Sequence, residues 1–133
     1  MEPGYGCGEK TVTKWLRRQP GEPRTQVAVA RPVRAALVIA RFFRHESCGQ
    51  CTQCREGTGW LHKLMVSLEA GTATPSDLDV IDEVTRFMDG HTICALSDAA
   101  AWGSGWFLRR FRQEFEDHVT HGGCPLAETS FEV

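Results

Sequence analysis

The sequence lacks any long hydrophobic run. Its most apolar stretch, around residues 35–43, is interrupted by Arg41 and falls well short of the roughly 18 residues that a membrane-spanning helix requires. The N-terminal residues MEPGYGCGEK also lack the basic start and apolar segment of a secretory signal peptide. We therefore expect neither membrane insertion nor secretion. A mitochondrial presequence remains compatible with the basic residues that follow, although Pro20 and Pro23 interrupt an amphipathic helix there.

Several features of nucleotide-dependent enzymes are missing as well. The sequence contains no internal repeat and no strand-rich segment, and the glycines of residues 4–8 follow no strand of the kind that precedes a phosphate-binding loop. We also find no pairing of a nucleophile with a general base. These absences argue against a self-sufficient enzyme, and we expect no catalytic residue in this chain.

Charge is distributed unevenly along the chain. The net charge is −2, but residues 1–55 carry an excess of basic side chains and residues 56–133 an excess of acidic ones. The basic residues are scattered, without interleaved aromatic residues or a recognition motif, so we expect no nucleic-acid partner. Two interpretations of the basic half remain, which are docking on an acidic protein surface and ordinary solvation.

Helical periodicity predicts an all-α fold, a small four-helix bundle with an extended N-terminal arm. Residues 1–32 are interpreted as an extended basic arm that docks on a partner, residues 33–121 as the four-helix domain, and residues 122–133 as a C-terminal tail. The predicted helices cover residues 33–45, residues 55–70, a segment that starts at Pro75 with Ser76 as its cap and ends at Gly90, and residues 104–119.

The apolar side chains of each predicted helix indicate which face is buried. Residues 33–45 are apolar nearly all round, which is typical of a buried helix. The other three helices show one apolar face each, formed by Trp60, Leu61, Leu64, Met65 and Leu68, by Leu78, Ile81, Val84, Phe87 and Met88, and by Phe107, Leu108, Phe111, Phe115 and Val119.

Three of the six cysteines lie close together in the segment HESCGQCTQCREG, residues 45–57. Cys48, Cys51 and Cys54 follow one another at intervals of three residues, a spacing at which local disulfides would be strained. A metal site in a reducing compartment explains this spacing better than a disulfide framework does. The fourth ligand is expected to be Cys94, which directly follows the third predicted helix.

A [4Fe–4S] cluster is the preferred occupant of this ligand set, because one short loop can present three thiolates to three irons while the fourth iron is bound from elsewhere. Structural zinc and redox-active thiols are the alternatives, although zinc sites usually use two separated C-x2-C pairs. Cys7 and Cys124 are not assigned as ligands, and His91 is expected to cap the third helix rather than bind metal.

Other residues of the cysteine-rich segment have expected supporting roles. Gly49 and Gly57 would allow unusual backbone angles around a compact anionic cluster. Arg55 and His45 would offset the negative charge of the thiolates or donate hydrogen bonds, with plain surface solvation as the alternative for each.

Two motifs carry a resemblance to a known family. ESCGQCTQCREGTGW, residues 46–60, and GHTICALSDAAAW, residues 90–102, resemble the C-terminal cluster-binding part of the NADH-oxidising, 51-kDa flavoprotein subunit of respiratory complex I. The same module is similar to part of the diaphorase subunits of NAD-linked hydrogenases and formate dehydrogenases. The resemblance covers residues 33–120, and departs from the usual motifs at Gln53, Ser97 and Gly103, none of which is a ligand.

The resemblance implies a [4Fe–4S] cluster bound by Cys48, Cys51, Cys54 and Cys94, with Ala95 and Leu96 near a flavin. It further implies that electrons come from FMN reduced by NADH and continue to iron–sulfur centres of a neighbouring subunit. Because this chain has no flavin or NADH site of its own, those cofactors are expected on a separate partner chain, and this chain is not catalytically complete alone.

The resulting hypothesis is one piece of a split subunit of NADH:ubiquinone oxidoreductase. Its expected location is the matrix side of the mitochondrial inner membrane, in the peripheral arm, with the bacterial cytoplasm as the alternative. A competing hypothesis is a non-redox assembly or structural subunit that uses the cluster, or zinc, to stabilise a small fold.

Overall fold

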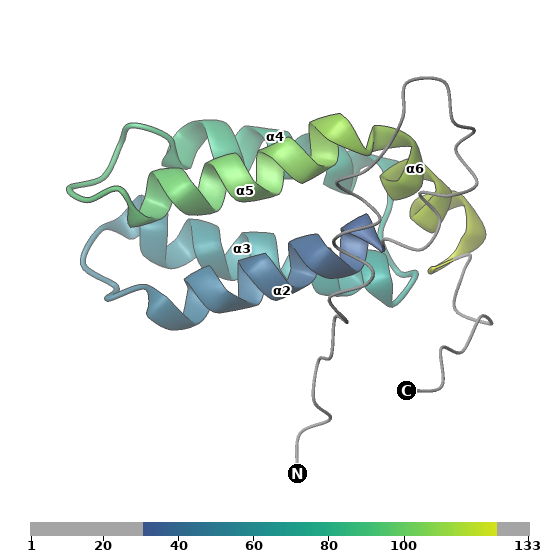
Figure 1. Ribbon diagram of the computed structural model, residues 1–133, viewed down its shortest axis with the longest axis horizontal. Coiled ribbons are helices and arrows are strands. Elements are labelled where there is room, and N and C mark those ends of the chain that lie inside the picture. The colour runs from purple at the N-terminus through teal and green to yellow at the C-terminus, as the bar shows by residue number, and fades with distance from the viewer. Residues whose placement is uncertain (1–30, 125–133) are drawn as a thin grey trace, which may run out of the picture. The chain divides into compact units, whose positions relative to one another are not determined.

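The computed structural model describes residues 31–124 of the chain, and these residues are mainly helical (Figure 1). The helices are α2 (Pro32–Glu46), α3 (Thr52–Glu69), α4 (Pro75–Met88), α5 (Leu96–Arg110) and α6 (Arg112–His121). The described residues contain no strand and no helix long and apolar enough to cross a membrane. The predicted all-α class is therefore confirmed, with one helix more than expected. Most of the predicted arm and tail lies outside the described residues.

The four longer helices form a bundle of two pairs. Helix α2 packs against α3 and α5, and α4 packs against the same two helices, which also contact each other across the bundle. The α2–α3 and α4–α5 connections lie at the same end of the bundle, whereas α6 lies at the opposite end (Figure 1). Two segments far apart in the sequence are thus brought to one end of the molecule.

The core is mainly aliphatic and draws on every helix. Its members recur at the three- and four-residue intervals of a helix face, and burial of these faces supplies most of the stability of such short helices. Fully buried side chains include Val33 and Ala36 of α2, Leu61, Met65 and Leu68 of α3, Leu78, Ile81 and Met88 of α4, Leu108 of α5, and Phe115 of α6.

Helix α2 is less buried than its composition predicts. Val33, Ala36 and Ala40 face the core, but Val38 and Phe42 are 42% and 56% exposed. The expectation of a helix buried all round is therefore wrong. Two neighbouring helices can cover only part of its surface, and the remaining apolar residues lie on an uncovered face.

Two aromatic residues assigned to the core also point outwards. Trp60 of α3 and Phe87 of α4 are 53% and 64% exposed, although each adjoins a buried residue, Leu61 and Met88 respectively. Neighbouring residues on a helix differ by about 100° in direction, so the edge of an apolar stripe can fall on either side of the interface.

Helix α4 begins with a different cap from the one predicted. Its N-cap is Thr74 rather than Ser76. The Asp77 carboxylate accepts hydrogen bonds from the Thr74 backbone N–H and hydroxyl, at 2.6 and 2.9 Å. The prediction of Ser76 as the cap is corrected, because Pro75 occupies the first helical position, which places the cap one residue before it.

The predicted helix over residues 104–119 is divided in the structure. Helix α5 starts eight residues earlier, at Leu96, and ends before Phe111, whose φ of −123° and ψ of 32° are not helical. The Phe111 carbonyl then accepts the Glu114 N–H at 2.9 Å, which starts α6. Phe111 and Phe115 are both buried, as predicted. The change of direction between α5 and α6 allows both side chains to face the core.

Polar contacts join α2 and α3, including an ion pair between Arg34 and Glu69 at 3.7 Å and a hydrogen bond between Arg44 and His62. Arg44 Nη1 lies 2.9 Å from His62 Nδ1. Burial of the imidazole, followed by the nearby charges of Arg44 and Arg41, lowers the pKa of His62 below its ordinary value. Since arginine can only donate, His62 accepts this bond in its neutral form.

This contact predicts a pH dependence of stability. As the pH falls below about 6.5, the ordinary pKa of histidine, the unfolded chain binds a proton at His62 before the folded chain does, and the free energy of unfolding decreases. The variant His62→Gln should lose this part of the dependence. Urea unfolding of both proteins over a pH series gives the free energy of unfolding at each pH. The same change of this free energy with pH in both proteins would contradict the prediction.

Candidate metal centre

The candidate site lies at the end of the bundle that carries both cysteine-containing loops. Cys48 and Cys51 lie between α2 and α3, Cys54 lies in the first turn of α3, and Cys94 lies between α4 and α5. Figure 1 shows both connections at this end. The topology therefore brings the loop of Cys94 to the same end as the other cysteines, and its role as the fourth ligand stays a prediction.

Close packing of α3 on α4 holds the two loops together. A Cβ atom placed on Gly57 would lie 2.5 Å from Sδ of Met88, the last residue of α4. Gly57 is helical and lies within α3, so its expected role in unusual backbone angles is wrong. Instead, its missing side chain allows α4 to approach α3 just beyond Cys54.

A buried hydroxyl links the end of α4 to the start of α5 across the α4–α5 loop. Ser97 is fully buried in the first turn of α5 and donates a hydrogen bond to the Met88 carbonyl at 3.2 Å. The Asp98 carboxylate accepts the Gly90 N–H at 2.8 Å. These bonds close the loop that carries Cys94, and sequence reasoning placed Ser97 only as a departure from the family motif.

The four thiols differ in exposure. Cys54 is buried, Cys51 is half-buried, and Cys48 and Cys94 are exposed. Within residues 31–124, no three Cys, His, Asp or Glu side chains are gathered closely enough to hold one metal ion. In a cubane each thiolate binds a different iron, so its ligands stand farther apart than those of a mononuclear site. Thiols on two loops at the same end of the bundle therefore suit a four-iron cluster better than a single metal ion.

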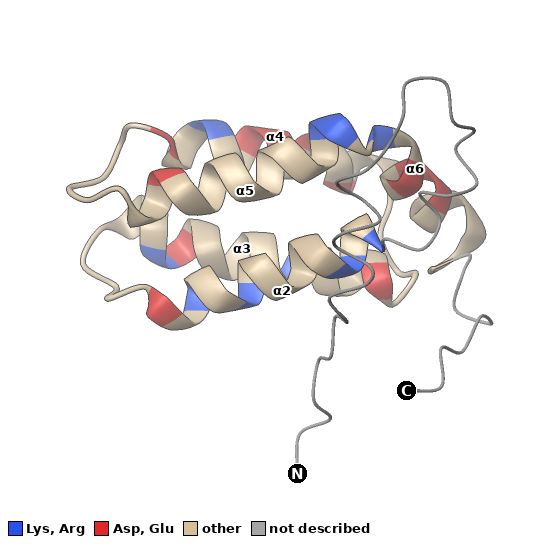
Figure 2. Cartoon of the chain, in the orientation of Figure 1, with Lys and Arg blue, Asp and Glu red and all other residues tan. Residues whose placement is uncertain are grey.

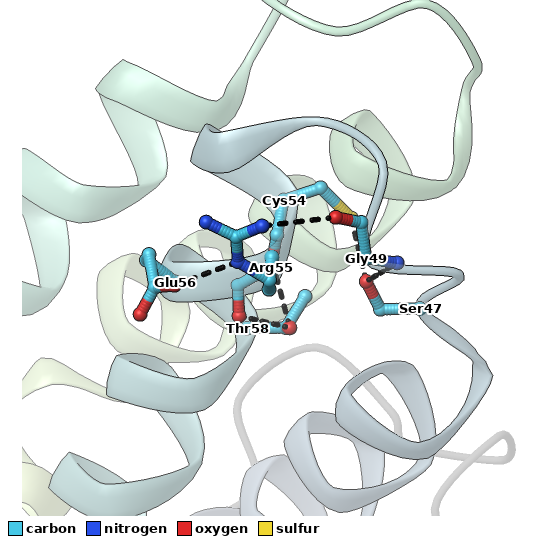
Figure 3. A network of polar contacts seen from close by, with 6 residues as sticks. All are labelled: Ser47, Gly49, Cys54, Arg55, Glu56 and Thr58. Carbon is cyan, nitrogen blue, oxygen red and sulfur yellow. Dashed lines mark hydrogen bonds and ion pairs between the residues drawn. The ribbon is translucent and has the colours of Figure 1, made fainter.

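The backbone of the cysteine loop is shaped by Gly49 and Arg55. Gly49 has a φ of +78°, a conformation that other residues rarely adopt. Arg55 donates from Nη1 to the Gly49 carbonyl at 3.4 Å and from Nε to Glu56 at 2.8 Å (Figure 3). Arg55 therefore stabilises the conformation of the loop. Its expected compensation of the thiolates' negative charge stays a prediction.

The N-termini of two helices supply positive potential at this end. Helix α3 starts directly after Cys51, with no side-chain cap and no acidic residue in its first turn. Helix α5 starts two residues after Cys94, also without a side-chain cap, although Asp98 in its first turn offsets part of the positive potential there. Uncapped N–H groups and the helix dipole favour an anionic group, and four thiolates with an iron–sulfur core are anionic. The residues present therefore fit the expected cluster.

The remaining residues singled out from the sequence lie apart from the thiols or have other partners. His45 pairs with Glu46 at 3.0 Å in an exposed position. His91 Nδ1 donates to the Asp89 carbonyl at 2.7 Å, which agrees with its predicted role at the end of α4. Cys124 follows α6, and Cys7 lies outside the described residues.

Sequence reasoning missed two polar residues near the site. Ser47 Oγ lies 3.3 Å from Cys54 Sγ, and Trp102 donates from Nε1 to Asp89 at 2.8 Å. The signal for Ser47 was its position directly before the first cysteine. No signal in the sequence linked Trp102 to Asp89, because their contact depends on how α5 lies beside the end of α4.

Comparison with known proteins identifies the same part of the chain. Residues 34–118 match the family described as the NADH-ubiquinone oxidoreductase-F iron–sulfur binding region. The mitochondrial NADH dehydrogenase [ubiquinone] flavoprotein 1 of Dictyostelium discoideum is 48% identical over 87 residues, which are 65% of this chain and 18% of the relative. An NADH-quinone oxidoreductase subunit of Rickettsia akari is 52% identical over 81 residues, which are 61% of this chain and 19% of the relative.

A third relative agrees with these two. The corresponding NADH-quinone oxidoreductase subunit of Rhodobacter capsulatus is 47% identical over 87 residues, which are 65% of this chain and 20% of that protein. The matched part of the chain therefore spans at most a fifth of the length of these relatives. The match covers both cysteine loops and the helices that hold them, in agreement with the resemblance and with the [4Fe–4S] cofactor predicted from the motifs. The chain belongs to the family of NADH-ubiquinone oxidoreductase-F iron–sulfur binding regions.

Proposed function

We propose that this chain is the electron-transfer module of an NADH:ubiquinone oxidoreductase, with one [4Fe–4S] cluster held by Cys48, Cys51, Cys54 and Cys94. The observation that carries the proposal is the location of both cysteine loops at one end of a bundle whose family is described as iron–sulfur binding. When bound, such a cluster supplies reversible one-electron chemistry. The protein's own residues bind it, orient it and shield part of it.

The exposure of the thiols argues for a partner at this end of the bundle. Cys48 and Cys94 are exposed, and Ile93, beside Cys94, is 85% exposed. An apolar side chain next to a redox ligand is suited to a covering surface rather than to water. Ala95 and Leu96, which follow Cys94, remain the proposed contacts with a flavin on that partner.

We propose that the partner is a separate flavin- and NADH-binding chain. About four fifths of the length of each relative lies outside the part matched here. In the split arrangement, residues 33–121 would be the cluster domain, residues 1–32 a docking arm and residues 122–133 a tail. The matrix side of the mitochondrial inner membrane is the proposed location, since one relative is named as mitochondrial, and the bacterial relatives support a cytoplasmic arm as the alternative.

A second surface is suited to binding this partner. We call it the α2–α5 surface, formed by Val38 and Phe42 of α2 and by Trp102 and Trp106 of α5, which are 42–60% exposed. Helices α2 and α5 pack together at Ile39 and Gly103, where a Cβ atom on Gly103 would lie 3.3 Å from Ile39. Helical geometry places all four side chains on the outer side of this contact.

The α2–α5 surface carries no charge along its middle. Between Arg34 and Arg41 of α2, and between Asp98 and Arg109 of α5, no residue is Asp, Glu, Lys or Arg. Figure 2 shows the uncharged middle of α5 and the charged positions towards its ends. Large exposed apolar patches of this kind mark protein–protein contacts. We assign this surface to the flavin-binding chain, because that polypeptide corresponds to the part of the relatives outside the match.

This assignment predicts the effect of one matched pair of substitutions. Val38→Glu, on the α2–α5 surface, should weaken binding to the flavin-binding chain at least about tenfold, because a buried unpaired carboxylate opposes association. Val66→Glu is the control, since Val66 is 43% exposed on α3 and lies outside that surface. Titration of the purified partner with each variant measures the affinities. Equal weakening by both would contradict the assignment.

Isolation of the native assembly through this chain tests the proposed function. We expect mass spectrometry to identify a companion chain with flavin and NADH sites, together with other subunits of complex I. Companions from a hydrogenase or formate dehydrogenase would assign the module to that host instead. Recovery of the chain alone, or with partners that bind no flavin, would overturn the electron-transfer role in favour of a cluster or zinc ion that only stabilises the fold.

A further inference from the structure

The buried thiol among the four candidate ligands has a hydroxyl partner. Cys54 is 6% exposed, and its Sγ atom lies 3.3 Å from Ser47 Oγ (Figure 3). Ser47 lies in the loop after α2, seven residues before Cys54, so the turn of the chain between them brings the two side chains together. Water competes least for a hydrogen bond at a buried sulfur, so this contact has more electrostatic effect than one at an exposed thiol.

The direction of this hydrogen bond follows from the chemistry of a bound thiolate. A free thiol or a hydroxyl could each donate, but a cysteine that binds iron has lost its proton and can only accept. Ser47 must then be the donor. Its oxygen also lies 3.4 Å from the Gly49 N–H, which donates to it, and this leaves the hydroxyl hydrogen available for sulfur.

We propose that Ser47 is a positioning residue that donates a hydrogen bond to the Cys54 thiolate and thereby raises the reduction potential of the cluster. The proposal rests on the proposed function, in which Cys54 is a ligand. A donor at a ligating sulfur stabilises negative charge there, and the reduced cluster carries one more negative charge than the oxidised one. The reduced state therefore gains more from the bond.

Other polar groups near Cys54 are engaged elsewhere. Arg55 donates to the Gly49 carbonyl and to Glu56, and Thr58 donates from Oγ1 to the Cys54 carbonyl at 2.8 Å. Thr58 is buried and lies one helical turn beyond Cys54, but its hydroxyl reaches the backbone rather than the sulfur. It therefore provides a matched control for the loss of a hydroxyl near the ligand.

The test compares Ser47→Ala, Ser47→Thr and Thr58→Val in the full chain purified with its cluster. Iron content is measured first, and the midpoint potential is then determined by redox titration followed by electron paramagnetic resonance. We expect Ser47→Ala to keep its iron and to shift the midpoint to a more negative potential. Ser47→Thr, which keeps the hydroxyl, and Thr58→Val should both titrate like the wild type.

Each other outcome overturns the inference. An unchanged midpoint in Ser47→Ala would show that the hydroxyl does not act on the sulfur. Loss of iron in that variant would assign Ser47 to holding the loop, and equal shifts in Ser47→Ala and Ser47→Thr would assign the effect to side-chain size. Absence of a cluster from the wild-type chain is a distinct failure, since it refutes the proposed function before any variant is compared.

Discussion

Replacing Cys94 with alanine is expected to reduce the bound iron from about four atoms per chain to fewer than about one. Cys94 is the proposed ligand from the α4–α5 loop, so its loss leaves the cluster attached only to the loop before α3 and to α3 itself. Binding of a metal group by two segments also stabilises the folded state. We therefore expect the variant reconstituted with iron and sulfide to unfold at a clearly lower urea concentration than the wild type.

The exposure of Cys94 makes this test informative. Its thiol is exposed, so removing it costs little packing energy, and a change at such a site usually alters stability by less than about 0.5 kcal/mol. Cys124→Ala is the control, because Cys124 follows α6 at the other end of the bundle. It should keep both iron and stability. Normal iron content in the Cys94 variant would refute the assignment of this ligand.

Replacing Gly57 with valine is expected to destabilise the bundle by about 1–3 kcal/mol, the usual cost of overpacking a core. A Cβ atom at this position would lie 2.5 Å from Met88 Sδ and 2.7 Å from Met88 Cγ, so either the buried Met88 side chain shifts or α3 and α4 separate. That separation would move the loop that carries Cys94 away from the other cysteines. We therefore expect lower iron incorporation as well as a smaller free energy of unfolding.

Two further variants isolate the cause of this effect. Gly59→Val lies in the same helix, where a Cβ atom would meet nothing within 4 Å, so it should be neutral or slightly stabilising. Combining Gly57→Val with Met88→Ala should cost less stability than the sum of the two single changes, because the added methyl groups then fill space left by the buried Met88 side chain. Equal unfolding free energies for the two glycine variants would show that the approach of α4 to α3 is not limiting.

The helices of the bundle were largely predictable from the sequence. Residues 33–45, 55–70 and 75–90 were predicted within a few residues of α2, α3 and α4, because periodic apolar residues and Pro and Gly boundaries act locally. The start of α5 was missed because Gly103 and Gly105 weaken helix propensity. The helix continues through Gly103 because the absence of a side chain there permits contact with α2, and no local signal reports such a contact.

Predictions of burial were less accurate than predictions of helices. Val38, Phe42, Trp60 and Phe87 are apolar and helical, yet all are substantially exposed. Apolar character indicates that a side chain favours contact with other apolar groups, but whether it finds them within one chain depends on which helices lie beside it. Those neighbours come from distant parts of the sequence, and the α2–α5 surface could be defined only after the helices were placed.

The sequence by itself determined the chemistry of the candidate site and the family to which the chain belongs. The number of cysteines and their spacing are local properties, and they suffice to favour an iron–sulfur cluster over a disulfide framework. The tertiary structure decided how Cys94 reaches the other loop, which thiol is buried and which hydroxyl touches it. Those features depend on contacts between segments far apart in the chain, such as Gly57 with Met88, and the packing of several helices at once determines them.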